Sequence, residues 1–451
     1  MRASAPGKVL IVGGYLIVQS PNVGISIGVN ARFTTHVVSF SSSVSPNITT
    51  IHIFSPQFNQ NFTFTCVTDK NVVTAKQSEG PTSHFLYYAA LFGVAAARLL
   101  GSDAGQELHL ELLADNDFYS QRNYLETHNE TVNVSNLRQL PKNLPLVGKV
   151  SKTGLGSSAA MTTSIIACLC SHFHQSNNVK LELIHRVAQI AHSVAQGKIG
   201  SGFDVFTAVY GTCVYRRFPV RSVEALVKSV EWPEMVSVSE LSQCIALETE
   251  WVPYEPFHLP QGLKLVLGDV HFGGTSTPGM VGKVMTWLKS VSDMPSNLWE
   301  KLRENNKAYV QQLRALSMQS STCSMEHQVA LSVLQCVRMA EYKPTNEAEE
   351  RIISAFKLAA ANRLYLREMG IAAGVKIEPE EMTELLNDTA SLPGVFAVGC
   401  PGAGGYDAVF ALVIGDANCS VVEQFWESYT KLNVCPLLVR EDCGGLLIET
   451  V

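Results

Sequence analysis

The chain has 451 residues, of which 46% are hydrophobic and 16% are charged. This composition excludes a disordered chain, because it supplies enough apolar side chains for a large core, and the length suggests two or three domains. The formal net charge of -6 argues against bulk binding to nucleic acid or to an anionic membrane, so an anionic ligand would need a local cluster of cations.

Few features of the sequence indicate the cellular compartment. The 11 cysteines have no clear metal-ligand spacing, which indicates reduced, buried thiols in a reducing compartment. No apolar run is long enough to span a bilayer, and the N-terminus leads into a predicted strand instead of a signal peptide. The C-terminal Glu-Thr-Val is not a Ser-Lys-Leu peroxisomal address. We expect a cytoplasmic protein, while an internal or absent address leaves a peroxisome-type organelle open.

The first predicted strand, at residues 9–12, follows a Pro-Gly turn and Lys8, and two glycines and Tyr15 come after it. A lysine at a strand edge is most often a solvated residue, so the position of Lys8 does not by itself indicate chemistry. Residues 48–66 alternate apolar and polar side chains, as half-buried antiparallel strands do, and carry no candidate chemistry. Apolar periodicity predicts further strands at 23–31, 34–40, 108–113 and 145–150 and helices at 82–100 and 161–173.

Residues 115–121 are polar and by spacing alone form a turn. Residues 121–140 lack periodicity and are predicted to be a mobile loop.

A glycine-rich turn at residues 152–160, Lys-Thr-Gly-Leu-Gly-Ser-Ser-Ala-Ala, runs straight into a predicted helix. Gly154 and Gly156 let the backbone turn without a side-chain clash and bring N–H groups close to an anion. The free N–H groups and partial positive charge of a helix N-terminus suit a triphosphate. Of the hydroxyls of Ser157 and Ser158, one could bind Mg²⁺ and another could cap the helix.

This turn is not the common phosphate-binding loop, because no lysine follows its last glycine. The alternative interpretation is an ordinary Gly-Ser turn with a serine N-cap.

A second glycine-rich turn follows the amphipathic helix predicted at residues 181–196. Three glycines between residues 197 and 202 indicate an unusual backbone path that can approach a ligand closely. Asp204 comes at the end of this turn, where an aspartate is most often a helix N-cap. For Lys198 the simpler interpretation is a solvated side chain.

The second half of the chain begins after a domain junction, which we expect within residues 220–251. A buried strand at 263–267 leads to Gly-Gly-Thr-Ser-Thr-Pro, a helix start that suits an anion or is simply a capped helix. Residues 287–341 and 345–369 are predicted to be helical, and strands are predicted at 395–398 and 408–414.

Two arginines lie one helical turn apart at Arg363 and Arg367 and share a face. Surface arginines are the usual explanation, but paired guanidinium groups also suit a phosphorylated ligand. A third glycine-rich segment, Gly-Ala-Gly-Gly at residues 402–405, follows the strand at 395–398.

Several of these blocks together resemble the GHMP kinases. The Gly-Leu-Gly-Ser-Ser-Ala core, the Pro-Gly-Lys…Gly-Gly-Tyr block at the N-terminus and the Gly-Ala-Gly-Gly segment are similar to the three motifs of that superfamily. The preceding Lys-Thr and the stretches at 115–121, 268–278 and 362–369 look closest to phosphomevalonate kinases of the eukaryotic type.

The resemblance implies a two-domain α+β fold with the active site in the cleft. The N-terminal domain would be ribosomal protein S5 domain 2-like and span 1–225, and the C-terminal domain would be ferredoxin-like and span 226–451. It further implies ATP- and Mg²⁺-dependent phosphorylation of (R)-5-phosphomevalonate in isoprenoid biosynthesis. The alternatives are mevalonate kinase or another GHMP small-molecule kinase, and a catalytically silent nucleotide-binding regulator.

The resemblance also implies roles for individual residues. Lys8 would stabilise charge on the transferred phosphoryl group, Asp204 would polarise the acceptor, and Ser157 or Ser158 would bind Mg²⁺. ATP would be bound by Lys152, Thr153, Gly154, Leu155, Gly156, Ser157, Ser158, Ala159, Ser120 and Gln121. The acceptor would be bound by Lys198, Ser201, Gly202, Ser276, Arg363, Arg367 and Gly404.

Overall fold

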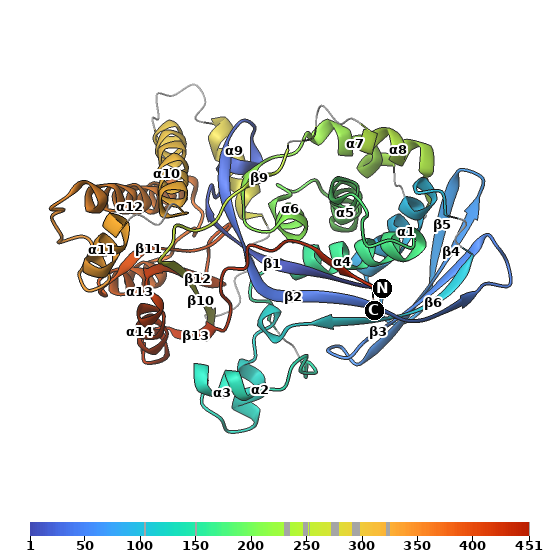
Figure 1. Ribbon diagram of the computed structural model, residues 1–451, viewed down its shortest axis with the longest axis horizontal. Coiled ribbons are helices and arrows are strands. Elements are labelled where there is room, and N and C mark those ends of the chain that lie inside the picture. Colours follow the sequence, from blue (N-terminus) through green and yellow to red (C-terminus); the bar gives the residue numbers. More distant parts are fainter. Residues whose placement is uncertain are drawn as a thin grey trace.

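The computed structural model describes residues 1–102, 105–148, 151–229, 235–246, 251, 253–271, 279–290, 298–321 and 325–450. Figure 1 shows a large sheet with helices packed on one face and, at one end, a smaller sheet with its own helices. Ser276 and the last two residues of the strand predicted at 145–150 lie outside the described residues.

The large sheet positions both glycine-rich turns. Within the described ranges it has ten strands, in the order β14-β1-β2-β6-β3-β4-β5-β8, and β7 pairs with both β2 and β9. Only the β3–β6 pair is parallel among the strand pairs of the described chain. The strands are β1 (Arg2–Val12), β2 (Val23–Ser42), β3 (Ile48–Ser55), β4 (Gln60–Asp69), β5 (Val72–Glu79), β6 (Gln106–Ala114), β7 (Cys213–Arg216), β8 (Met235–Ser237), β9 (Glu255–Pro256) and β14 (Leu447–Glu449).

One face of this sheet is covered by helices (Figure 1). α1 and α4 pack together through small and apolar side chains, and α4 also contacts β1 and β2. Fully buried aromatic rings such as Phe33, Phe64 and Phe92 fill the core between the layers. The helices of this part are α1 (His84–Leu99), α4 (Ser157–Phe173), α5 (Leu181–Gln196), α6 (Phe203–Tyr210), α7 (Val220–Ser229) and α8 (Val238–Ala246), with short turns η1 (Leu16–Val18) and η2 (Asn116–Phe118).

The smaller sheet has the order β11-β12-β10-β13 in the described residues, and its strand pairs are antiparallel. Numbered along the chain this is 2-3-1-4, the ferredoxin-like order, so the predicted α+β fold class is confirmed. Its strands are β10 (Leu263–His271), β11 (Val395–Gly399), β12 (Ala408–Ile414) and β13 (Asn433–Leu437). Its helices are α9 (Met280–Ser290), α10 (Leu298–Ser321), α11 (Met325–Leu334), α12 (Glu347–Ala373), α13 (Glu380–Ala390) and α14 (Asp416–Glu427).

Three of the predictions for single elements differ from the structure. The strands expected at 23–31 and 34–40 are one long strand, β2, because the chain stays extended across residues 32–33 and pairs with β1 and β6. Residues 121–140, expected to be an irregular loop, contain the short helices α2 (Arg122–Thr127) and α3 (Val134–Gln139). Residues 145–148 are not a strand, and the amide of Leu146 donates to the carbonyl of Gln57.

The two sheets divide the chain later than residue 225. β8 pairs with β5 and β9 pairs with β7, so residues 235–237 and 255–256 still belong to the large sheet. β14 returns to pair with β1 from the far end of the chain. We infer that the second unit begins near β10 and that the last strand rejoins the first unit. No helix among the described residues combines the length and the apolar character needed to cross a membrane.

Candidate active site

The glycine-rich turn at 152–156 delivers the chain into α4 through left-handed backbone. Gly154 has φ 79° and Gly156 has φ 76°, and α4 begins at Ser157. A Cβ on Gly156 would lie 2.9 Å from Lys8 Cε, so the turn and the lysine side chain are packed against each other. The sequence prediction of a glycine turn opening a helix N-terminus is therefore confirmed.

Lys8 lies on β1 and lines this turn. Its Nζ donates to the Gly154 carbonyl at 2.7 Å, its backbone amide donates to Leu155 at 2.9 Å, and Nζ lies 5.0 Å from the centre of the Phe203 ring. Burial lowers the pKa of Lys8, and the charge of Asp204 acts in the opposite direction. The two residues that sequence analysis singled out for catalysis are thus electrostatic neighbours.

Asp204 lies in the first turn of α6, and Gly202 is the N-cap, so Asp204 is not the cap that its position suggested. Its Oδ1 accepts from the amide of Val205 at 3.0 Å, which leaves Oδ2 facing His192. Gly202 has φ 84°, and a Cβ there would lie 2.4 Å from the Phe218 ring. The glycine therefore fixes the path of the chain just before the carboxylate.

His192 joins the two glycine-rich turns. It lies on α5 with only 3% of its surface exposed, and its Nε2 is 3.1 Å from Ser158 Oγ and 3.9 Å from Asp204 Oδ2. Burial lowers the pKa of His192, partly offset by Asp204, so the ring is held neutral. Ser157, by contrast, is a buried residue at the start of α4.

Two adjoining cavities meet at this centre, and Ser201 lines both. The loop cavity, of about 230 Å³, is lined by Lys8, Gly154, Phe203 and Gly404 among others. The turn cavity, of about 1140 Å³, is lined by Asp204, His192, Lys198, Gly202 and Arg217 among others.

The third glycine-rich segment closes the loop cavity from the second unit. The amide of Gly402 donates to the carbonyl of Leu10 at 3.3 Å, and the hydroxyl of Tyr15 donates to the carbonyl of Ala403 at 2.6 Å. Gly404 has φ 79°, and a Cβ there would lie 2.2 Å from the Ile377 carbonyl oxygen. This segment therefore contacts the first unit through its backbone.

Four of the predicted nucleotide residues make other contacts. Thr153 is buried and donates through its hydroxyl to the Asp117 carbonyl, and Lys152 forms an isolated bridge with Tyr119. The Ser120 hydroxyl donates to Asp269 at 2.7 Å, and the Gln121 amide donates to the carbonyls of residues 116 and 119. The contact of Lys152 is made by its backbone, and of these four residues only Thr153 lines either cavity.

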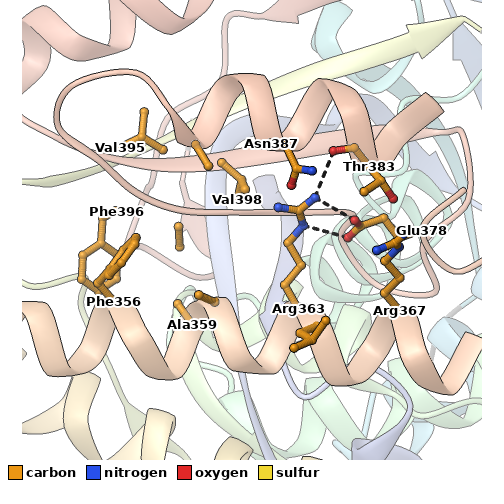
Figure 2. A pocket seen from close by; sticks show the side chains of 14 residues that line it. Phe356, Ala359, Arg363, Arg367, Glu378, Thr383, Asn387, Val395, Phe396 and Val398 are labelled. Atoms are coloured by element: carbon orange, nitrogen blue, oxygen red, sulfur yellow. Dashed lines mark hydrogen bonds and ion pairs between the residues drawn. The ribbon is translucent and has the colours of Figure 1, made fainter. Parts of the chain in front are cut away.

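The arginine pair does not reach the cleft. Arg363 forms a two-point ion pair with Glu378, through Nε at 2.9 Å and Nη2 at 2.7 Å, and donates to Thr383 (Figure 2). Arg363 and Arg367 line a separate cavity between α12, α13 and β11, which shares no lining residue with the loop and turn cavities. The predicted phosphate contact therefore fails for Arg363 in this arrangement, because a buried carboxylate already neutralises its charge.

Sequence reasoning missed His192 and Arg217. Both are polar residues within apolar surroundings, and a polar side chain on the buried face of the amphipathic helix α5 was the available signal for His192. Arg217 follows β7 and donates to the carbonyls of Val18, Ile199 and Gly200, so it holds the turn that carries Asp204.

The fold and this cleft are shared with a class of small-molecule kinases. Residues 120–212 match the family described as "GHMP kinases N terminal domain". A phosphomevalonate kinase of Streptococcus pneumoniae, solved with phosphomevalonate and AMPPNP, superposes with a TM-score of 0.59 at 13% identity over 98% of this chain and 99% of the other. That likeness establishes the shared fold.

Sequence relatives identify the family within that class. A peroxisomal phosphomevalonate kinase of Arabidopsis thaliana is 33% identical over 99% of this chain and 96% of its own length. A phosphomevalonate kinase of Gibberella zeae is 31% identical over 99% and 96%. The chain belongs to the phosphomevalonate kinase family.

Proposed function

We propose that the protein transfers the γ-phosphoryl group of ATP to the phosphate of (R)-5-phosphomevalonate and so forms (R)-5-diphosphomevalonate. A phosphate oxygen of the acceptor attacks the γ-phosphorus, the bond to the β,γ-bridging oxygen breaks, and ADP leaves with that oxygen. Both reactants are anions, so catalysis consists mainly of positioning and of charge stabilisation.

The contact between Lys8 and the glycine turn, within the field of Asp204, is the observation that carries this proposal. The ammonium group is set where charge develops on the transferred phosphoryl group, and its fixed position avoids reorganisation during the reaction. Asp204 orients the acceptor. The second pKa of a phosphate monoester is about 6, so the nucleophile is largely ionised near neutral pH and a strong base is not required.

The donor set fits Mg²⁺. Hydroxyl and carboxylate oxygens are its preferred protein ligands, and in nucleotide sites it usually keeps few protein ligands beside the substrate phosphates. When bound with ATP, Mg²⁺ supplies charge neutralisation on the phosphates. Of the two candidates, we assign Ser158 as the protein ligand, because its hydroxyl lies beside His192, which in turn faces Asp204.

His192 is proposed to position the Ser158 hydroxyl. A hydroxyl that binds a cation must direct its proton to another acceptor, so that its lone pairs face the metal. The neutral His192 Nε2, 3.1 Å from Ser158 Oγ, is such an acceptor. This second contact would orient the ligand in the way that outer-shell partners of metal sites do.

The turn cavity is proposed to bind the acceptor through Lys198, Arg217 and Ser201. Arg217 is half-buried and donates to three carbonyl groups, and within the described ranges no carboxylate forms an ion pair with it. A doubly charged phosphate and a carboxylate would offset its charge. Arg217, and not Arg363, is therefore the arginine that we propose binds the phosphorylated acceptor.

Measuring ADP release with ATP and Mg²⁺ tests the proposal against its alternatives. We expect rapid release with 5-phosphomevalonate and slow release with mevalonate or with no acceptor. Faster turnover with mevalonate would identify an alcohol kinase, and no acceptor-dependent release would indicate a silent nucleotide binder. For the compartment we propose the cytoplasm, and imaging of a tagged full-length chain would distinguish it from a peroxisome-type organelle.

A further inference from the structure

The outer face of the large sheet carries a cluster of metal-binding side chains. Along β6, Leu108 and Leu110 point into the core, so Glu107 and His109 point to solvent. Along β3, Ile51 and Ile53 are buried, and His52 points outward. These strands lie toward the end of the sheet away from the smaller sheet (Figure 1), so the cluster is separate from the active site.

Strand register brings the three side chains together. β3 and β6 are parallel, and His52 pairs directly with His109. Their rings stack with centres 4.6 Å apart and planes inclined by 13°. Glu107 Oε1 lies 3.2 Å from His52 Nε2 and 3.8 Å from His109 Nε2, and all three ligand atoms lie within 4.8 Å of one another.

The separations of Glu107 from the two histidines are close to those around a tetrahedral metal ion. Ligand atoms about 2.1 Å from a tetrahedral zinc lie about 3.4 Å apart. The two separations from Glu107, 3.2 Å and 3.8 Å, bracket that value. The histidine rings are nearly parallel, so one ring must rotate for both Nε2 atoms to face the same ion. Two imidazoles and one carboxylate are a ligand set that suits Zn²⁺ and its transition-metal neighbours, whereas Mg²⁺ prefers oxygen ligands alone.

The partners of His52 favour this use. Its Nδ1 lies 3.1 Å from Thr63 Oγ1, and the Thr63 hydroxyl donates to Glu79 at 2.8 Å. Because the Thr63 proton goes to Glu79, its oxygen is available to accept from Nδ1–H. In that tautomer Nε2 carries no proton, so its lone pair is available to bind an ion on the side of Glu107. Metal-binding histidines are commonly oriented by an outer-shell contact of this kind.

We propose that His52, Glu107 and His109 form a zinc-type transition-metal site with its remaining coordination open to water. The ion bridges β3 and β6, and through Thr63 and Glu79 its ligands connect to β4 and β5. The site acts as a clamp on the sheet and takes no part in phosphoryl transfer. Without an ion, the contact between His52 and Glu107 forms with a proton on Nε2, which the ion would displace.

Calorimetric titration of the chelator-treated full-length protein with zinc chloride tests the site. We expect one zinc ion to bind, and we expect His52→Asn and His109→Asn each to abolish that binding. Thr63→Val, which removes only the outer-shell oxygen, should weaken affinity by about 10-fold. His258→Asn, at an exposed histidine elsewhere, is the matched control and should bind zinc as the unaltered protein does.

Co²⁺ absorption spectra guard against binding through cysteine. Co²⁺ bound to nitrogen and oxygen gives no thiolate charge-transfer band, and a strong band of that kind would overturn the assignment. So would absence of zinc binding, or binding that persists in both histidine variants. Kinase turnover with Mg²⁺ and ATP should be the same with and without zinc, and a loss of turnover in the histidine variants would contradict the separation of the two sites.

Discussion

At the scale of single residues, Lys8 is expected to matter at least as much as Asp204. The acceptor phosphate is largely ionised already, so screening two anions from each other is the greater need. Lys8→Ala should lower kcat by about 10²-fold or more, as the loss of a transition-state charge donor does, and at least as far as Asp204→Ala. Turnover numbers at saturating substrates measure both.

The control for that comparison is Lys264→Ala, since Lys264 forms an exposed ion pair with Asp416 away from the cleft. Its kcat should be unchanged. If kcat were nearly unchanged in Lys8→Ala but strongly reduced in Asp204→Ala, the electrostatic account would be contradicted. General-base catalysis by Asp204 would then be the main contribution.

His192 and Ser158 should behave as one unit. If His192 acts only through the Ser158 hydroxyl, Ser158→Ala and His192→Asn should each weaken Mn²⁺ binding in the ATP complex, and the double variant should be little worse than either. Electron paramagnetic resonance of bound Mn²⁺ measures this without reference to turnover. Additive losses would show that the two residues act independently.

At the scale of elements, the turn into α4 needs glycine for two separable reasons. Gly156→Ala should cost about 1 kcal/mol for a left-handed alanine and should also displace Lys8, whose Cε a Cβ would approach to 2.9 Å. Gly101 has φ 79° and open space around it, so Gly101→Ala carries the first cost alone. The thermal unfolding temperature should fall in both variants, whereas kcat/KM for ATP should fall only in Gly156→Ala.

Equal activity in the two variants would mean that the packing between Gly156 and Lys8 has no catalytic consequence.

α5 carries a second buried histidine that makes stability depend on pH. His185 packs edge-on against Phe206, Tyr210 and Trp251, and burial lowers its pKa to about 3 from 6.5. Between about pH 3 and pH 6.5 the unfolded chain binds one more proton than the folded protein. The contribution of His185 to the free energy of unfolding is therefore complete above about pH 6.5 and is lost as pH decreases. The slope amounts to at most about 1.4 kcal/mol per pH unit.

His185→Gln should therefore flatten the decline of the unfolding temperature below pH 6.5, whatever its effect at neutral pH. His174→Gln, at the exposed C-cap of α4, should leave the decline unchanged. An unaltered acid slope in His185→Gln would assign the effect to other groups.

Elements with strong local signals were predictable from the sequence. The helix at 181–196 and the strand at 408–414 have the predicted bounds, because each buries a continuous series of apolar side chains. β2 was divided in two because a bulge and a change of partner interrupt the pattern but not the strand. α2 and α3 were missed because each has only six residues, too few for a periodic signal.

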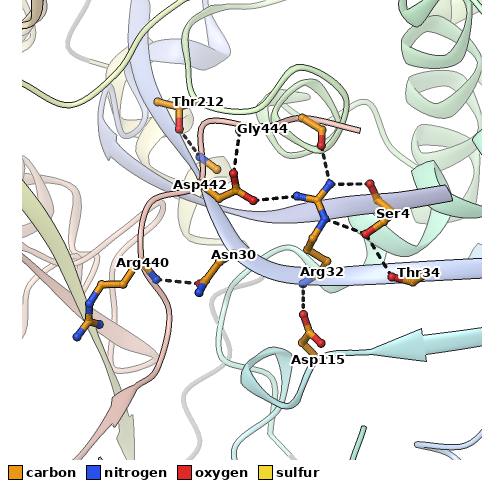
Figure 3. Close-up of polar contacts among 11 residues, drawn as sticks. Ser4, Asn30, Arg32, Thr34, Asp115, Thr212, Arg440, Asp442 and Gly444 are labelled. Atoms are coloured by element: carbon orange, nitrogen blue, oxygen red, sulfur yellow. Dashed lines mark hydrogen bonds and ion pairs between the residues drawn. The ribbon is translucent and has the colours of Figure 1, made fainter. Parts of the chain in front are cut away.

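At the scale of the whole molecule, the C-terminal segment contacts the first two strands of the large sheet. Arg32 on β2 donates to Asp442 at 3.0 Å, to Gly445 at 2.6 Å and to Ser4 on β1, so it joins three segments distant in sequence (Figure 3). Its side chain is 13% exposed, whereas Arg2, paired with Glu449, is 48% exposed.

Arg32→Met should lower stability by about 2 kcal/mol, because it leaves partly buried oxygens of Ser4, Asp442 and Gly445 without this charged donor. Arg2→Met removes an exposed pair and should cost less than about 1 kcal/mol. Thermal unfolding of both variants measures the difference. Equal losses would show that the three-segment network adds nothing beyond an exposed ion pair.

The contacts of the site could be predicted only where the backbone itself carries the signal. The glycine turns indicated the loop, since it needs an unusual chain path, whereas Lys8 and Asp204 were singled out by the resemblance to the GHMP kinases. Arg363 looked suitable by spacing, but Glu378, 15 residues later, neutralises it through tertiary packing. His192 and Arg217 reach the site because α5 and β7 pack beside the two turns. A polar residue on the buried face of α5 was a local signal for His192, but it does not show which turn the residue contacts.

Phosphorus NMR of the full reaction tests the central claim most directly, namely that the Lys8 and Asp204 cleft joins a phosphoryl group to a phosphate acceptor. With ATP, Mg²⁺ and 5-phosphomevalonate, the account predicts that the monoester signal is replaced by the two coupled signals of a diphosphate, and that Lys8→Ala prevents this. A monoester signal that persists while inorganic phosphate accumulates would contradict it.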